Sequence, residues 1–386
     1  METQRKNGSL RTRVVSILLV CCLCLAGAWF VQASSSGGDI GTETLSYEPF
    51  QGAPSYTILA NGTSYFAKDA HGVTDYQGTN VSCIVNTVIN ALPSNLGGSI
   101  YFASGDYYFS NSIIIDRSNV TLEGEGAGNT QFFLNAGANC HLIAISNKTI
   151  NSVNFIYVEN LELWGDKQAE GPADSCQSDG IYIHAYAGDM FFTNVFIDDF
   201  QSSGILACPT SRIWNVWIQN CEIEGCNNEG IYLMSSTGLD YVHITDNYLF
   251  RNNNGIRMDG IHDRSVDIED NVIYGNLQRG MLLEGAQYVN IVGNQIFDNS
   301  VSTRNTYDGI YIGQYLGQNS YYITINGNTI TNEGFYNTQR DGVFIGDLSD
   351  RLTIMGNTLY GNSNSSIHIA HGAAKYSTIA NNTGYP

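Results

Sequence analysis

Apolar residues in this chain follow a short strand-like pattern. Beyond residue 180, a glycine is repeatedly followed by two apolar residues that one variable position separates, and the string returns every 24 to 33 residues. The copies begin at Gly180, Gly204, Gly230, Gly255, Gly280, Gly309 and Gly342, with a degenerate copy at Ser366. Alternation with a period of two predicts short strands that bury one face.

A second repeated string places an Asn between apolar positions. The Asn copies are Asn247, Asn271, Asn294, Asn328 and Asn357, and an earlier copy has Cys221 at the same place. Each repeat therefore holds three short strands separated by polar turns. One repeat cannot bury its apolar face alone, so the repeats must stack, and we expect the asparagines to form a hydrogen-bonded ladder along the stack. The pattern predicts an all-β fold, a single-stranded parallel β-helix of about ten coils.

The first coil of such a stack leaves an open edge that must be covered. In residues 80–92 the apolar side chains recur with helical spacing, and Pro93 follows. This pattern predicts an amphipathic capping helix at 80–92.

The first 33 residues have the pattern of a secretory signal peptide. Four basic residues precede an apolar run at 14–30, and small residues follow it. We expect residues 1–33 to be a signal peptide, 34–59 a linker or entry segment, and 60–386 the β-helix domain. The protein is then secreted or on the cell surface, with no membrane span after cleavage, although a retained anchor is the alternative. Six cysteines outside this segment permit disulfides without fixing their pairing, namely Cys83, Cys140, Cys176, Cys208, Cys221 and Cys226.

Acidic residues outnumber basic ones 36 to 17, which gives a net charge of −19. Nucleic-acid binding needs a basic surface, so this class of partner is excluded. The same charge disfavours an anionic polymer unless cations bridge it.

Three segments resemble the pectate-lyase-like β-helix superfamily. Residues 65–75 are similar to its entry segment, 97–108 to its first coil and 122–126 to its second. The likeness covers about residues 60–386 and implies a right-handed helix that contacts carbohydrate. The superfamily includes pectate lyases, polygalacturonases, tailspike depolymerases and sugar C5-epimerases, but the catalytic motifs of these subfamilies are absent. A homotrimer would match the tailspike branch, yet no trimer-forming segment is present.

Chemistry is expected on the outer face of the glycine-led strands. Asp259 and Glu284 share an offset on adjacent repeats, so their backbones should lie about 5 Å apart. Two carboxylates that close either raise one pKa or bind a cation. We therefore predict Asp259, Glu284, Arg257 and Arg279 as catalytic residues, and a Ca²⁺ held by Asp259 and Glu284 as an option.

Residues on the same face or in its turns are the predicted substrate contacts. They are Tyr182, His184, Glu229, Tyr232, His262, Asp308 and Tyr311. Aromatic rings beside carboxylates suit sugars, although the same rings could simply pack across coils, and the charges could form solvated salt bridges. Insertions at 164–178, 299–307 and 332–340 flank this face.

Two classes of function follow from these features. The first is an exported carbohydrate-active enzyme that cleaves a polysaccharide as a lyase or glycoside hydrolase in a groove along this face. The alternative is a non-catalytic cell-surface protein that binds carbohydrate, adheres or builds an envelope. The glycan itself is not specified by the sequence.

Overall fold

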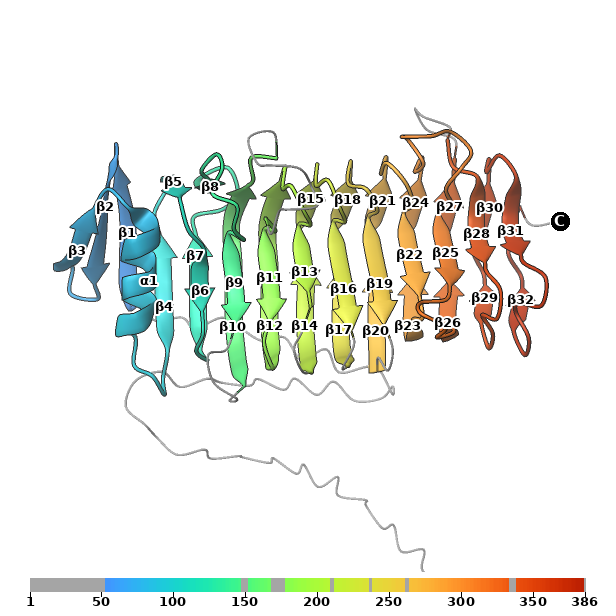
Figure 1. The fold of residues 1–386 in the computed structure, drawn as a ribbon, viewed down its shortest axis with the longest axis horizontal. Coiled ribbons are helices and arrows are strands. Elements are labelled where there is room, and N and C mark those ends of the chain that lie inside the picture. Colours follow the sequence, from blue (N-terminus) through green and yellow to red (C-terminus); the bar gives the residue numbers. More distant parts are fainter. Residues whose placement is uncertain are drawn as a thin grey trace, which may run out of the picture. The chain divides into compact units, whose positions relative to one another are not determined.

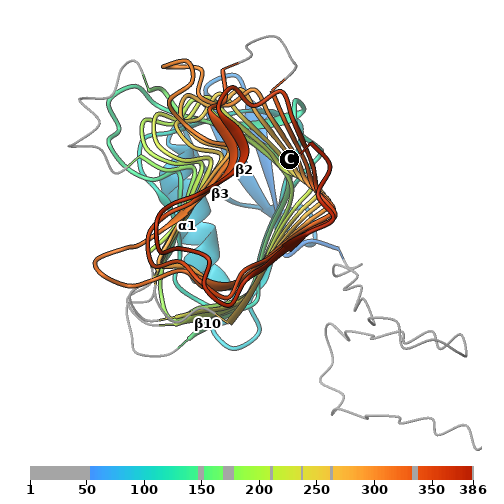
Figure 2. The same ribbon diagram turned by 90° about the vertical axis from the view of Figure 1, so that its right-hand side faces the viewer.

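The structure is a computed structural model that describes residues 53–146, 152–167, 178–208, 212–235, 238–260, 264–332 and 338–384. Residues 54 onward form one unit, a stack of coils that Figure 1 shows from the side and Figure 2 along its axis. Each coil contributes a strand to each of three faces. The fold is the predicted right-handed parallel β-helix, whereas the predicted signal segment, Cys176 and His262 lie outside the described residues.

The glycine-led strands stack as one ten-stranded parallel sheet, here called sheet 1. It comprises β6 (Ile113–Ile115), β9 (Ile143–Ser146), β11 (Ile181–His184), β13 (Ile205–Ala207), β16 (Ile231–Ser235), β19 (Ile256–Gly260), β22 (Met281–Glu284), β25 (Ile310–Gly313), β28 (Asp341–Ile345) and β31 (Ser365–Ile369). Ten strands in one sheet confirm the expected number of coils.

The other two faces are joined into one continuous sheet. Sheet 2 comprises β4 (Gly98–Phe102), β7 (Val120–Gly124), β10 (Val153–Trp164), β12 (Ala187–Asp198), β14 (Ile213–Gln219), β17 (Leu239–Thr245), β20 (Arg264–Glu269), β23 (Gln287–Val292), β26 (Tyr321–Asn326), β29 (Thr353–Met355) and β32 (Thr378–Ala380). Sheet 3 comprises β5 (Gly105–Phe109), β8 (Thr130–Leu134), the ends of β10 and β12, β15 (Glu222–Glu224), β18 (Tyr248–Phe250), β21 (Val272–Tyr274), β24 (Gln295–Phe297), β27 (Thr329–Thr331) and β30 (Thr358–Tyr360). Strands β10 and β12 turn the corner without a break, at Asn160 and Asn194, which have positive φ.

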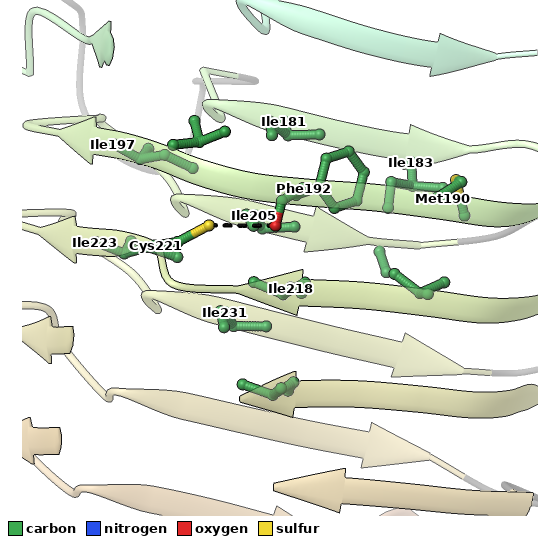
Figure 3. Packing of buried hydrophobic residues seen from close by; sticks show 14 of the residues in the cluster. Ile181, Ile183, Met190, Phe192, Ile197, Ile205, Ile218, Cys221, Ile223 and Ile231 are labelled. Carbon is green, nitrogen blue, oxygen red and sulfur yellow. Dashed lines mark hydrogen bonds between the residues drawn. The ribbon is translucent and has the colours of Figure 1, made fainter. Parts of the chain in front are cut away.

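The inward side chains of the three faces fill one apolar core. Ile181, Ile205 and Ile231 stack at equivalent positions of successive coils, and all are fully buried (Figure 3). Close packing requires the glycine at the start of seven of these strands, from β11 to β28. A Cβ on Gly180 would lie 2.7 Å from the carbonyl oxygen of Gly204, which real Cβ atoms do not tolerate.

The N-terminal edge is covered as predicted. Helix α1 (Val81–Ala91) buries one apolar face, and Asn80 caps it by accepting a hydrogen bond of 3.0 Å from the backbone N–H of Cys83. Three antiparallel strands, β1 (Tyr56–Asn61), β2 (Ser64–Asp69) and β3 (Thr74–Gly78), precede the helix, and β1 pairs with β4. The strand β1 begins at Tyr56, ahead of the domain start predicted at residue 60. No described helix is long and apolar enough to cross a membrane.

The predicted asparagine ladder runs through the turn between sheets 2 and 3. The amide of Asn247 donates to Asn271 at 2.9 Å, and the pattern continues through the later asparagines to Asn382. At the other end Cys221 takes the place of Asn. Its backbone N–H donates to Asn247 at 2.8 Å, and its thiol lies 3.4 Å from the carbonyl oxygen of Phe192 (Figure 3).

A second ladder, which the sequence interpretation missed, lies in the turn after sheet 3. It consists of Asn252, Asn276, Asn299, Gln339 and Asn362, and the backbone N–H of Cys226 donates to its first member at 3.0 Å. Most of its members follow a first-ladder asparagine by five residues, which is a signal that the sequence contained. Cys221 and Cys226 are therefore buried free thiols that terminate the two ladders, and Cys83 and Cys208 are also free.

We predict that Asn294→Ala lowers the free energy of unfolding by about 3 kcal/mol, because the buried amides of Asn271 and Asn328 and two carbonyl oxygens lose a partner. Chemical denaturation followed by circular dichroism measures the change. The exposed Asn326 lies on the next coil, and Asn326→Ala is the matched control, expected to change stability by less than about 0.5 kcal/mol. Equal losses in both variants would contradict a special role for the ladder.

Candidate active site on the outer face of sheet 1

The outward side chains of sheet 1 form columns in the predicted register. Tyr232 pairs with Arg257 on the next coil, and Asp259 pairs with Glu284. Successive coils lie about 4.8 Å apart, so side chains at one offset are direct neighbours.

A paired arginine–carboxylate cluster lies at the centre of this face. Asp259 is only 1% exposed, and the guanidinium of Arg257 binds both of its oxygens, at 3.0 and 2.6 Å. The hydroxyl of Tyr232 donates to Asp259 at 2.6 Å, and Arg257 also reaches Glu229 at 3.4 Å. Burial, with the hydrogen bond to Asp259, raises the pKa of Tyr232, so this phenol keeps its proton. Asp259 is therefore fully engaged by its neighbours.

Glu284 is the carboxylate that remains available. It is half-buried beside Asp259, and within the described part of the chain it takes part in no hydrogen bond or ion pair. Burial raises its pKa, the charge of Asp259 raises it further, and Arg257 and Arg279 oppose the shift. A carboxyl group with a raised pKa and no protein partner can exchange a proton with a ligand.

Arg279 lies on the other side of Glu284 and is only weakly paired. Its guanidinium lies 4.9 Å from the ring centre of Tyr307 and 4.7 Å from that of Tyr311, and its Nε is 3.9 Å from Asp308. This buried Nε has no hydrogen-bond partner among the described residues. Burial lowers the pKa of Arg279. Asp308 is instead bound at 2.9 and 3.0 Å by Arg340, so Arg279 keeps hydrogen-bonding capacity for a ligand.

Two glycines let Tyr311 lie flat toward Glu284. The register partner of Glu284 on the next coil is Gly313. A Cβ there would lie 2.9 Å from the hydroxyl oxygen of Tyr311, and a Cβ at Gly346 would lie 3.4 Å from it. The phenol of Tyr311 therefore occupies the place next to Glu284 where other residues would have a side chain. Burial and the nearby Glu284 raise the pKa of Tyr311, which stays protonated.

The structure thus brings together eight of the predicted residues and separates Tyr182 and His184 from them. The cluster comprises Glu229, Tyr232, Arg257, Asp259, Arg279, Glu284, Asp308 and Tyr311. Tyr182 and His184 lie four coils away from Glu284, about 19 Å at the usual strand separation. There Tyr182 stacks between His141 and His184, with ring centres 3.9 and 5.3 Å apart.

Arg340 is the main residue that the sequence interpretation missed. It ends the predicted insertion at 332–340, and a cation there, next to a column of acids, was the available signal. Its Nε lies 2.9 Å from both Asp308 and Asp341.

The proposed Ca²⁺ pair does not fit the geometry. Calcium takes six to eight oxygen ligands. Both oxygens of Asp259 are engaged by Arg257, which leaves Glu284 alone to bind a cation. Within the described residues no group of three or more His, Cys, Asp or Glu could hold a metal ion.

An acidic cluster on sheet 3 was not anticipated. Asp198, at the end of β12, lies beside Glu224 and Glu162 and is 6% exposed. Burial and these neighbouring carboxylates raise its pKa to about 8.

Comparisons with known proteins support the fold. A family model described as "Right handed beta helix region" matches residues 215–383. The DFA-IIIase of Arthrobacter chlorophenolicus A6, in complex with GF2, superposes with a TM-score of 0.54 at 13% identity, over 78% of this chain and 90% of that one. The A-module of the mannuronan C-5 epimerase AlgE4 of Azotobacter vinelandii gives 0.50 at 16% identity, over 78% and 96%. No curated protein matches the sequence.

These findings define the class of fold as a right-handed parallel β-helix, without a particular subfamily. Identities this low establish a shared fold and no shared activity.

We predict that Asp198→Asn flattens the pH dependence of stability. The folded-state pKa of Asp198 is raised from 3.8 to about 8, so its protonated form stabilises the native state at low pH and this contribution is lost as the pH rises toward 8. The variant should match the wild type near pH 4 and melt at a higher temperature near pH 8. Thermal unfolding at a series of pH values between 4 and 8 measures the difference in melting temperature. Asp106→Asn, which changes an exposed acid on the same sheet, is the control. Parallel curves for Asp198→Asn and wild type would contradict the assignment.

Proposed function

We propose that this protein is a polysaccharide lyase that breaks a uronate-containing glycan on the outer face of sheet 1, with Glu284 as the base. The observation that carries the proposal is the contrast between the two central carboxylates. Asp259 is saturated by Arg257 and Tyr232, whereas Glu284 has a raised pKa and no side-chain partner among the described residues. One available carboxylate suits chemistry that needs a single base.

The neighbours of Glu284 supply the other roles in a β-elimination. The guanidinium of Arg279 neutralises the uronate carboxylate, which makes the C5 hydrogen more acidic. The carboxylate of Glu284 takes the C5 proton, the electron pair forms the C4–C5 double bond, and the C4–O4 bond breaks. The leaving O4 takes a proton from the phenol of Tyr311, which burial keeps protonated.

In this proposal Tyr232, Arg257 and Asp259 do not react with the substrate but set the surroundings of Glu284. Arg257 and Tyr232 bind Asp259 in place, and the charge of Asp259 raises the pKa of Glu284, which brings that carboxyl closer to the pKa of an effective base. Hydrolysis with two carboxylates would need Asp259 to face the substrate, and its bidentate pair with Arg257 disfavours that role. Arg257 and Arg340 are neutralised by their acidic partners, so the weakly paired Arg279 is the cation that we assign to a uronate on this face.

The proposal also includes a binding partner and a cellular location. A polysaccharide is the partner, and the protein acts outside the cytoplasm, as the signal-like residues 1–33 indicate. Two proteins that share this fold are an epimerase named for mannuronan and a DFA-IIIase crystallised with GF2, and they motivate the substrate class alone.

We predict that Glu284→Gln lowers the rate of elimination about 10²- to 10⁴-fold, because an amide cannot take the proton. The assay incubates the protein with uronate and neutral polysaccharides and records reducing ends together with the ultraviolet absorbance of the unsaturated product. Glu269→Gln removes another half-buried carboxylate, on sheet 2, and should have no effect. The acid limb of the pH–rate profile should lie above the usual range of a Glu, since the pKa of Glu284 is raised.

Other results would decide between the competing functions. New reducing ends without the absorbance would mean a glycoside hydrolase and contradict the assigned chemistry. Binding without new ends on any polymer would mean the non-catalytic, adhesive or structural class.

A further inference from the structure

A column of backbone residues with positive φ runs along sheet 2, one from each of several successive coils. Its members from the middle of the stack onward are Tyr241, Ser265, Tyr288, Tyr322, Arg351 and Tyr376, with φ between 53° and 57°. The paired residues on either side are in register from coil to coil, so these six stack above one another.

Tyrosine is an unexpected residue at such a position. Bulky side chains rarely adopt positive φ, and Asn or Asp does so more readily. Two of the earlier coils of the same column follow this preference with Asp189 and Asn215, whereas the coil before them has Phe155. Tyr241, Tyr288 and Tyr322 nevertheless are 46–53% exposed, so they contribute little to the core. Strained backbone that displays an exposed aromatic side chain is typical of a functional surface.

The planar groups of this column stack on one another except at one coil. Tyr288 and Tyr322 are stacked, with ring centres 5.0 Å apart, and the guanidinium of Arg351 lies 5.7 Å from the rings of both Tyr322 and Tyr376. Between Tyr241 and Tyr288 the intervening coil has Ser265. The column therefore has a missing ring at Ser265, with a tyrosine on either side.

The missing ring leaves a real hollow. Tyr241, Ser265, Tyr288, Asn290 and Tyr322 line an open cleft of about 510 Å³. The side-chain nitrogen of Asn290 donates to Asp267 at 2.8 Å, and its carbonyl oxygen has no hydrogen bond within the described part of the chain. The cleft thus has aromatic walls, a serine at its base and a free amide oxygen at its rim.

We infer that this cleft, here called the Ser265 slot, binds a neutral sugar ring of a glycan. The negative face of an aromatic ring attracts the C–H groups of a pyranose, and the hydroxyls around that ring need polar partners such as Ser265 and Asn290. The lining residues carry no formal charge, and the chain has a net charge of −19, so a neutral sugar fits better than a uronate. An apolar partner would leave the serine and the amide without hydrogen bonds.

The Ser265 slot is independent of the proposed lyase site. It lies on sheet 2, whereas Glu284 and Arg279 belong to the outer face of sheet 1. The proposed function can therefore fail while the slot still binds, and the reverse is also true.

The test titrates the full protein with cellohexaose, laminarihexaose, mannohexaose and maltohexaose by calorimetry. We expect one of these neutral hexasaccharides to bind. Ser265→Tyr should weaken that binding about tenfold or more. A fourth tyrosine would supply the missing ring of the column and fill the space in which the sugar ring stacks. The neighbouring coils already hold tyrosine at the same φ, so this variant should fold, which circular dichroism checks. Tyr288→Ala should weaken binding to a similar extent by removing one wall.

Two matched variants serve as controls. Phe155→Ala removes an exposed aromatic residue of positive φ on β10, far from the slot, and should leave binding unchanged. Glu284→Gln should also bind the hexasaccharide as the wild type does, whatever happens to its activity.

Three results would overturn the inference. One is the absence of binding by all four neutral hexasaccharides, and another is binding that Ser265→Tyr and Tyr288→Ala leave intact. The third is a wild-type dimer in sedimentation analysis that Ser265→Tyr dissociates, which would make the slot a contact between copies of this chain.

Discussion

Every coil of this protein depends on the coils on either side for its backbone hydrogen bonds. A strand of three residues such as β13 or β15 has no partner within its own repeat, so its N–H and C=O groups pair only with the neighbouring coils. The same stacking buries the apolar face that one repeat would expose. Register between coils is therefore fixed, because a slip of one residue would turn the buried side chains outward.

The turns at the corners of each coil also depend on the adjacent coils for their hydrogen bonds. A tight turn between two sheets leaves buried backbone groups that strand pairing cannot satisfy. The side-chain nitrogen of a ladder asparagine donates to a carbonyl oxygen of the preceding coil, and its side-chain oxygen accepts from the backbone N–H of the ladder residue on that preceding coil. At the N-terminal end of each ladder a cysteine can replace Asn, because Cys221 and Cys226 need only offer their backbone N–H and a small side chain. The ladders thus satisfy the turns while the sheets satisfy the strands.

This constraint explains which features of the sequence were predictive. The period of two, the repeat length and the buried Asn determined the strands, the coils and the adjacency of Asp259 and Glu284. That pattern did not indicate which neighbouring side chain binds Asp259. Arg257 and Glu284 both have Asp259 within reach, and only side-chain geometry shows that the guanidinium binds it and leaves Glu284 available. The flat position of Tyr311 likewise depends on Gly313, which the repeat explains only as a small residue.

A stack of fixed register also explains why the outer faces differ in chemistry. Outward side chains are free to vary, yet each one lies about 4.8 Å from the same offset of the next coil, so any residue type that recurs becomes a continuous column. On sheet 1, Arg257 binds Asp259 and leaves the neighbouring Glu284 unpaired among the described residues, and this is where we place the proposed base. On sheet 2 the column is mostly aromatic, and the coil that lacks a ring is where we propose that a sugar binds. In both faces a local departure from the column, rather than the column itself, carries the specificity, since the regular positions already satisfy one another.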